Sequence, residues 1–305
     1  MSNEFEVIEI YPKILVYRNV FKDPQKIYEI VKESAEQNDD RLLSKWSQWS
    51  IFGDYLNPTA PGVTPIFNMA ELDALEADTE IKQNQKLFLQ ELFENFYKVS
   101  EDYTNRFKNE LDFDLTEVSD VKDEHGNNIP RWQPYGPSIA KYHKDPENFV
   151  NGHGGKTGMA MTYHSDYIRE PIISPGYKFA ITVLSYFNDD YKGGEIDFAI
   201  GKELYSYKPK AGDWLVFPSG HPDVLNKDGM VYLHGVLEPS EEHKYFARMY
   251  WRRYSEGDQE WFDKEKEFGK ETWLSMQEGI MEQYRLDHPQ RYEIPEGVRI
   301  NESAK

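Results

Sequence analysis

Two ionisable residues, His164 and Asp166, lie one residue apart in the apolar and aromatic run MTYHSDY (residues 161–167). Successive side chains of a β-strand point to opposite faces, so an imidazole at 164 and a carboxylate at 166 project from one face. Such a pair supplies two of the three protein ligands of a facial metal site. The spacing alone is weak evidence, because a His-x-Asp pair often arises by chance and also occurs in solvated turns.

A third ligand is expected from a histidine on another strand. His234 lies inside the apolar run MVYLHGVLEP and is the histidine best able to reach inward. Taken alone, it would ordinarily be explained as a core histidine with satisfied hydrogen bonds. His221, in the Gly/Pro turn FPSGHPD, is a rival. The other histidines lie in loop-like, charged or C-terminal segments and are weaker candidates: His125, His143, His153, His243 and His288.

Two histidines and one carboxylate, with the remaining positions open, suit a non-haem Fe(II) that binds oxygen and a bidentate co-substrate. If that co-substrate is 2-oxoglutarate, its far carboxylate needs a cation. Lys244 follows His234 by ten residues in the run KYFARMYW, and Arg248 lies on the same face of that strand. A buried charge without a partner costs several kcal/mol, and a dianionic ligand would be that partner. The alternative is a surface strand edge on which both cations pair with Glu241 or Glu242.

The fold expected around these residues is a double-stranded β-helix, a jelly-roll or cupin-like barrel, in an α+β protein. Short β-type runs separated by Gly, Asn, Asp and Pro follow residue 137 without intervening helices, which disfavours a parallel α/β sheet. We expect strands at 139–143, 158–164, 177–187, 194–200, 203–208, 213–217, 230–237 and 244–251.

Helices are expected to back the barrel. Strand-like runs at 6–10 and 14–17 precede an Asp23-Pro24 helix start, and a long amphipathic helix is predicted from Ile81 to Phe107. The aromatic residues of the segment 38–66 indicate either a helix or loop packed on the core or a lid that faces the substrate. We therefore expect an N-terminal region at 1–136, a catalytic core at 137–253 and a C-terminal helical extension at 254–305.

The C-terminal extension carries an apolar stripe in a charged segment. It is expected to pack on the barrel, to pair with another subunit in a homodimer, or to close over a site; the sequence leaves these three open.

Composition narrows the partners and the setting. The 305 residues contain 35 Lys and Arg against 54 Asp and Glu, a net charge of −19 that disfavours nucleic acid. The absence of cysteine excludes disulfides, thiolate catalysis and cysteine-ligated clusters. The N-terminus has no signal-peptide pattern and no apolar run is long enough to span a membrane, so we expect a cytoplasmic protein without a membrane partner.

Three stretches resemble, in the same order, motifs of the Fe(II)/2-oxoglutarate-dependent oxygenases of the prolyl-4-hydroxylase-like group. They are LSYFNDDYKGGEIDF (184–198), YKPKAGDWLVFPS (207–219) and HGVLEP (234–239). The resemblance covers residues 139–253, about a third of the chain. Each piece is common, but their conjunction in this order is specific.

The resemblance implies a role for each matching residue. His164, Asp166 and His234 match the iron ligands, which carry the catalysis, and Lys244 matches the cation that holds 2-oxoglutarate. The segment between FPS and His234 is longer than the family usually has, which keeps His221 as a rival. No cation lies ten residues beyond His221, and this favours His234. The remaining co-substrate residues are Tyr186, which matches a carboxylate-binding tyrosine, Tyr142 as a pocket tyrosine, and Arg248 as the alternative cation.

The function implied is oxidative decarboxylation of 2-oxoglutarate coupled to hydroxylation of a C–H bond, with Fe(II), O₂ and ascorbate as a candidate reductant. A prolyl or other amino-acid residue of a peptide is the expected substrate, and a free amino acid or small metabolite is the alternative. The alternative from a different functional class is a cupin-type isomerase or binding protein that is not an oxygenase. It would keep the barrel but ordinarily needs more histidine ligands than the strand at 158–164 offers.

Overall fold

The structure is a computed structural model of the 305-residue chain. It describes residues 5–37, 46–50, 53–56, 72–74, 76–111, 113–122, 127–144, 159–166, 179–200, 203–219 and 232–253. Between 263 and 276 it also describes residues 263, 264, 267–269, 272 and 276.

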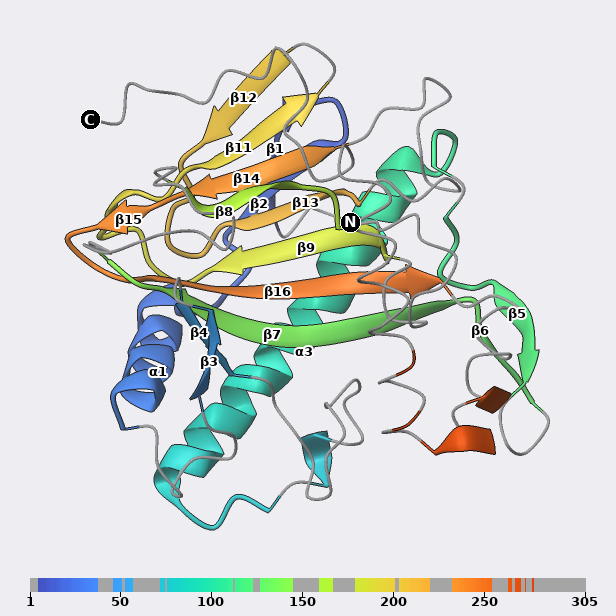
Figure 1. Ribbon diagram of the computed structural model, residues 1–305, viewed down its shortest axis with the longest axis horizontal. Helices are drawn as coiled ribbons and strands as arrows, with labels where there is room; N and C mark the ends of the chain where they lie inside the picture. The colour runs from blue at the N-terminus through green and yellow to red at the C-terminus, as the bar shows by residue number, and fades with distance from the viewer. Residues whose placement is uncertain are drawn as a thin grey trace.

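Two antiparallel sheets form the body of the molecule (Figure 1). The large sheet has the order β1 (Glu6–Tyr11), β2 (Ile14–Arg18), β13 (Trp214–Pro218), β9 (Phe179–Tyr186), β16 (Lys244–Arg253), β7 (Trp132–Tyr142), β4 (Gly53–Leu56) and β3 (Trp46–Ser50). The small sheet has the order β12 (Glu203–Tyr207), β11 (Ile196–Ile200), β14 (Leu233–Leu237) and β8 (Met159–His164). Two short pairs complete the strands: β10 (Lys192–Gly193) with β15 (Pro239–Ser240), and β5 (Val118–Lys122) with β6 (Asn128–Pro130).

Alternation along the large sheet builds two separate cores. Leu184 on β9 faces inward and packs with residues of the small sheet such as Phe198, whereas its neighbour Val183 packs on the helical side. The inner core lies between the two sheets, and the outer core lies between the large sheet and the helices. This is the predicted double-stranded β-helix, with one face of its large sheet covered by helices (Figure 1).

Two helices provide that cover, α1 (Pro24–Gln37) and α3 (Glu80–Phe107). The Asp23 carboxylate accepts a hydrogen bond from the Lys26 backbone N–H at 3.0 Å, as an N-cap residue does. The Thr79 hydroxyl caps α3 in the same way. Both helices begin within one residue of the predicted position, because capping residues and apolar spacing are local signals.

The segment from Trp46 to Leu56 differs from the expected helix or loop. It forms the hairpin β3–β4, and β4 pairs with β7 to extend the large sheet. Trp46 is buried and its indole N–H donates to the Ser34 hydroxyl of α1 at 3.0 Å. The spacing of aromatic residues by three suggested a helix, but pairing with the sheet overrides that periodicity.

The C-terminal helical extension, and with it a homodimer through these helices, falls almost entirely outside the described residues and stays a prediction. In the part of the chain that the structure describes, no helix has both the length and the apolar character needed to cross a membrane.

Candidate metal centre

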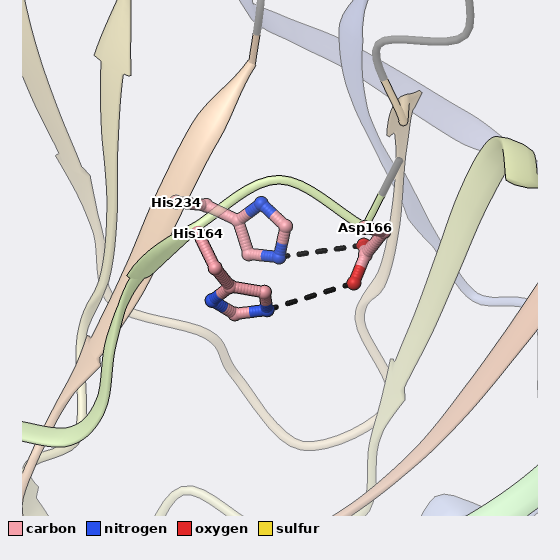
Figure 2. Close-up of side chains that lie close together, drawn as sticks. All are labelled: His164, Asp166 and His234. Carbon is pink, nitrogen blue, oxygen red and sulfur yellow. Dashed lines mark ion pairs between the residues drawn. The ribbon is translucent and has the colours of Figure 1, made fainter. Parts of the chain in front are cut away.

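Figure 2 shows the side chains of His164, Asp166 and His234 converging on one point. His164 at the end of β8 and His234 on β14 are direct cross-strand partners. The strand β8 ends at His164, so Asp166 reaches the site from the turn that follows the strand and not from the strand itself. One ligand atom from each of the three residues lies within 4.8 Å of the others.

The Nε2 atoms of the two histidines face the two carboxylate oxygens of Asp166. His164 Nε2 lies 3.5 Å from Asp166 Oδ1, and His234 Nε2 lies 3.4 Å from Asp166 Oδ2. The Nδ1 atom of His234 is 3.2 Å from the carbonyl oxygen of Tyr232, which can only accept, so Nδ1 carries the proton. This hydrogen bond leaves the Nε2 lone pair of His234 directed at the carboxylate, as metal-binding histidines require.

Burial sets the charges of the group. It lowers the pKa of His234 to about 4, so this imidazole is neutral at neutral pH. Burial alone would raise the pKa of Asp166, but His234, His164 and the hydroxyl of Thr182 together hold it well below its usual value. A buried carboxylate that faces two imidazole nitrogens fits a divalent cation, and two histidines with one carboxylate leave coordination positions for other ligands.

A buried lysine lies inside the same barrel. The side chain of Lys244 points between the sheets, is 1 % exposed and donates from Nζ to the carbonyl oxygen of Gly194 at 2.6 Å. Burial, with a smaller contribution from Lys208, lowers the pKa of Lys244 to about 7. The alternative of a surface edge is therefore wrong for Lys244.

The glutamates that this alternative invoked have other partners. Glu241 pairs with Lys192, and Glu242 lies 3.1 Å from Lys32 Nζ.

Two consecutive glycines shape the surroundings of Lys244. Gly193 and Gly194 have φ angles of +65° and +69°, which are costly for other residues. A Cβ atom on Gly193 would lie 2.4 Å from the carbonyl oxygen of Glu238. The tight turn directs the Gly194 carbonyl at the ammonium of Lys244, so the glycine pair of the motif serves the cation site.

Two tyrosine hydroxyls near Lys244, those of Tyr186 and Tyr191, are buried and have no hydrogen-bond partner in the described part of the chain. The Nζ atom of Lys244 lies 4.9 Å from the ring centroid of Tyr186 and 5.8 Å from that of Tyr191. Lys208 also contacts Tyr191, with Nζ 3.8 Å from the Tyr191 ring centroid and 2.9 Å from the Tyr191 carbonyl oxygen. Two ammonium groups and two unpaired hydroxyls fit a carboxylate ligand.

Sequence reasoning missed Tyr191 and Lys208. Tyr191 lies two residues before the glycine pair and Lys208 lies in the YKPKAGD run, so both are inside the recognised motifs. Their positions follow from the fold of loops and strand ends, which periodicity does not predict.

Tyr142 and Arg248 lie on the same inner face as Lys244, Tyr142 beside it on β7 and Arg248 four residues further along β16. Tyr142 is directly opposite Lys244 in the β7–β16 register and is buried. Burial lowers the pKa of Arg248, but Tyr250, Tyr142 and Asp166 raise it above its ordinary value overall. Arg248 thus interacts electrostatically with Asp166 of the ligand group, the three residues His164, Asp166 and His234. Lys244 instead contacts the glycine turn.

The other histidines take no part in this group as far as they are described. The rings of His143 and His243 lie 5.5 Å apart near the start of β16. The remaining four lie outside the described residues: His125, His153, His221 and His288.

Comparison with known proteins gives one family. The model of the 2OG-Fe(II) oxygenase superfamily matches residues 149–252, which include every residue of the ligand group and Lys244. No curated protein matches the chain.

Among solved structures, a prolyl-4-hydroxylase from Pseudomonas putida is 11 % identical over 80 % of this chain and 94 % of its own, with a TM-score of 0.42. The viral collagen prolyl hydroxylase of Paramecium bursaria Chlorella virus-1 is 13 % identical over 80 % and 90 %, with a TM-score of 0.42. The dioxygenase for auxin oxidation 1 of Arabidopsis thaliana is 13 % identical over 80 % and 84 %, with a TM-score of 0.44.

The family match over residues 149–252 contains the three converging side chains His164, Asp166 and His234. The chain contains a domain of the 2OG-Fe(II) oxygenase superfamily over residues 149–252, and its enzyme class is that of the Fe(II)/2-oxoglutarate-dependent dioxygenases.

Proposed function

We propose that His164, Asp166 and His234 hold Fe(II), that Lys244 holds the far carboxylate of 2-oxoglutarate, and that the enzyme hydroxylates an amino-acid side chain. The observation that carries the proposal is the convergence of the three ligand atoms within 4.8 Å inside the same barrel as a buried lysine. Residues 137–253 are the proposed catalytic core. When bound, iron with 2-oxoglutarate and O₂ supplies an oxidation that yields succinate, CO₂ and the hydroxylated product.

The residues of this chain bind and orient the reactants. Neutral His234 and ionised Asp166 are in the protonation states that a metal needs. Phe217 and Phe198 pack around His234, with ring centroids 4.9 and 6.0 Å from it, and keep that ligand dry and fixed. The hydroxyls of Tyr186 and Tyr191 are available to the carboxylate that Lys244 attracts.

The proposed substrate is a prolyl or other amino-acid residue of a peptide, with a free amino acid or small metabolite as the alternative. The net charge of −19 disfavours nucleic acid and favours neutral or basic substrates. The cytoplasmic setting and the homodimer stay predictions.

Turnover of 2-oxoglutarate tests the function directly. We expect succinate to form, and a substrate to gain one oxygen atom, when the Fe(II) protein is incubated with a panel of proline-containing peptides and free amino acids. Mass spectrometry of the panel measures both products, and which members react separates peptides from free amino acids. A metal-loaded protein that forms neither succinate nor a complex with 2-oxoglutarate would favour the cupin-type alternative.

The buried lysine predicts that 2-oxoglutarate binds more weakly as the pH rises. Without ligand the pKa of Lys244 is about 7, and a bound carboxylate would raise it. Affinity is therefore full below pH 7 and falls about tenfold per pH unit above it, until the pKa of the complex is reached. The groups that act on this pKa are Lys208, which lowers it further, and Glu195, which raises it.

Calorimetry of the anaerobic Mn(II) protein between pH 6 and 9, in buffers of different ionisation enthalpy, measures the affinity and the proton taken up. Lys244→Arg is the control, because arginine does not titrate in this range and should give a nearly flat profile. A wild-type profile as flat as that of the control would contradict the prediction.

A further inference from the structure

The carboxylate of Asp166 is held from behind by two buried hydroxyls. Thr182 Oγ1 on β9 lies 2.6 Å from Asp166 Oδ2, and Thr182 Oγ1 lies 2.7 Å from Ser219 Oγ, one residue past the end of β13. Thr182 is 0 % exposed and Ser219 is 1 % exposed. Among the described residues, Ser219 has no hydrogen bond to the metal or co-substrate residues themselves, and Thr182 contacts the site only through this hydrogen bond to Asp166.

The number of hydroxyl protons fixes which atom donates in each of these two hydrogen bonds. The carboxylate oxygen of Asp166 accepts, so the hydroxyl of Thr182 donates to it. The single proton of Thr182 is then used, and the Ser219 hydroxyl must donate to Thr182 Oγ1. The carboxylate oxygen thus receives a charge-assisted hydrogen bond from a donor that is itself polarised by a second one.

The backbone anchors the two hydroxyls to the turn that carries Asp166. The N–H of Ser219 donates to the Ala180 carbonyl at 2.9 Å, and this pairs the end of β13 with β9. The hydroxyl of Ser165, the residue between the two predicted ligands, donates to the Ser219 carbonyl at 2.8 Å. Because Asp166 lies beyond the end of β8, these contacts replace the sheet in fixing its position.

We propose that Thr182 and Ser219 are positioning residues that occupy one oxygen of Asp166 and leave the other to bind the metal. The proposal rests on the proposed function of Asp166 as a ligand. A carboxylate released from Thr182 would be free to rotate and to bind the metal with both oxygens, which would use a position needed by the co-substrate. The two hydroxyls therefore leave a coordination position free for the co-substrate and also strengthen metal binding.

Thr182→Val tests the proposal, because valine keeps the shape of threonine and removes the hydroxyl. We expect the affinity for Co(II), titrated alone under anaerobic conditions, to fall about 10–100-fold. The visible spectrum of bound Co(II) should also change, because it reports the coordination of the metal. Thr182→Ser restores the hydroxyl and is expected to return both readouts to near their wild-type values, and Ser219→Ala should give a smaller loss than Thr182→Val.

Ser185→Ala is the matched control. Ser185 lies on the same strand, is 0 % exposed and has a hydroxyl with no hydrogen-bond partner among the described residues, so its loss should not affect Co(II) binding. Thermal melts of the metal-free variants show whether each one folds. Should Thr182→Val fail to fold, Ser219→Ala and Thr182→Ser carry the comparison.

Asp166→Ala separates the ligand role of Asp166 from the positioning role of Thr182 and Ser219. If Asp166→Ala loses Co(II) binding while Thr182→Val and Ser219→Ala bind it like wild type with an unchanged spectrum, the positioning role is overturned and the ligand set stands. If Asp166→Ala binds Co(II) like wild type, the proposed ligand set fails and the positioning role fails with it.

Discussion

Replacing His234 with alanine is expected to abolish both metal binding and 2-oxoglutarate turnover. The imidazole of His234 is one of three groups that converge on the metal position. It is 4 % exposed, so its removal leaves a buried cavity in which water does not readily replace the lost ligand. The loss should exceed the 10–100-fold typical of a residue that only supports a ligand. Titration with Co(II) measures the binding, and succinate formation measures the turnover.

His243→Ala is the control for this variant. His243 lies immediately before β16 and outside the group of His164, Asp166 and His234, and its Nδ1 accepts a hydrogen bond from the backbone N–H of Lys144. His221→Ala tests the rival ligand. If His221→Ala abolishes metal binding and His234→Ala retains it, the proposed ligand set is wrong.

Replacing Lys244 with methionine is expected to have two opposite effects. Binding of 2-oxoglutarate should weaken by roughly 2–5 kcal/mol, because the carboxylate loses a buried, hydrogen-bonded charge. The metal-free and ligand-free protein should become more stable, because folding no longer buries an ammonium group. Calorimetry of the Mn(II) protein measures the first effect, and thermal unfolding measures the second.

The gain in stability should depend on pH in a defined direction. The pKa of Lys244 is about 7 in the folded protein and 10.5 in the unfolded chain, so between these values the unfolded state binds more protons. Wild-type stability therefore gains from a rise in pH across this window, and the advantage of Lys244→Met is greatest at pH 7 and below. An advantage that grows from pH 7 to 10 would contradict this account of the lysine.

Two variants separate this prediction from its alternatives. Lys192→Met removes an exposed lysine of the same glycine turn, which pairs with Glu241 at the surface, and should change neither property. Arg248→Met tests the other inward-facing cation. If Arg248→Met abolishes 2-oxoglutarate binding and Lys244→Met retains it, the roles of the two cations are reversed.

Local patterns predicted much of the fold. The strands of the barrel core and the helices α1 and α3 were found because alternation, apolar spacing and caps are encoded within each element. Strand parity also placed Lys244 and Arg248 on one face.

The hairpin β3–β4 was missed because its state depends on pairing with β7, which lies far away in the sequence.

The sequence predicted which residues form the candidate site, but it did not predict the turn and the contacts that position them. His234 was selected by its apolar surroundings, and the structure pairs it with His164 across β8 and β14. The turn that carries Asp166, and the contacts of Thr182 and Tyr191, depend on how loops and strand ends meet. A single sequence carries no local signal for such contacts, so the turn that carries Asp166 and the roles of Thr182 and Tyr191 are seen only in the folded structure.

The position of β2 next to β13 has a consequence for the order of folding. Arg18 on β2 bonds to Asp213 across 195 residues, and the Tyr232 hydroxyl bonds to the Pro12 carbonyl across 220. Contacts between such distant residues close slowly, because a long loop must be ordered before they form. On a ribosome, β2 can pair with β1 at once but must wait for β13, and His164 is synthesised well before its partner His234. The metal group therefore cannot assemble before β14 has been synthesised and has paired with β8.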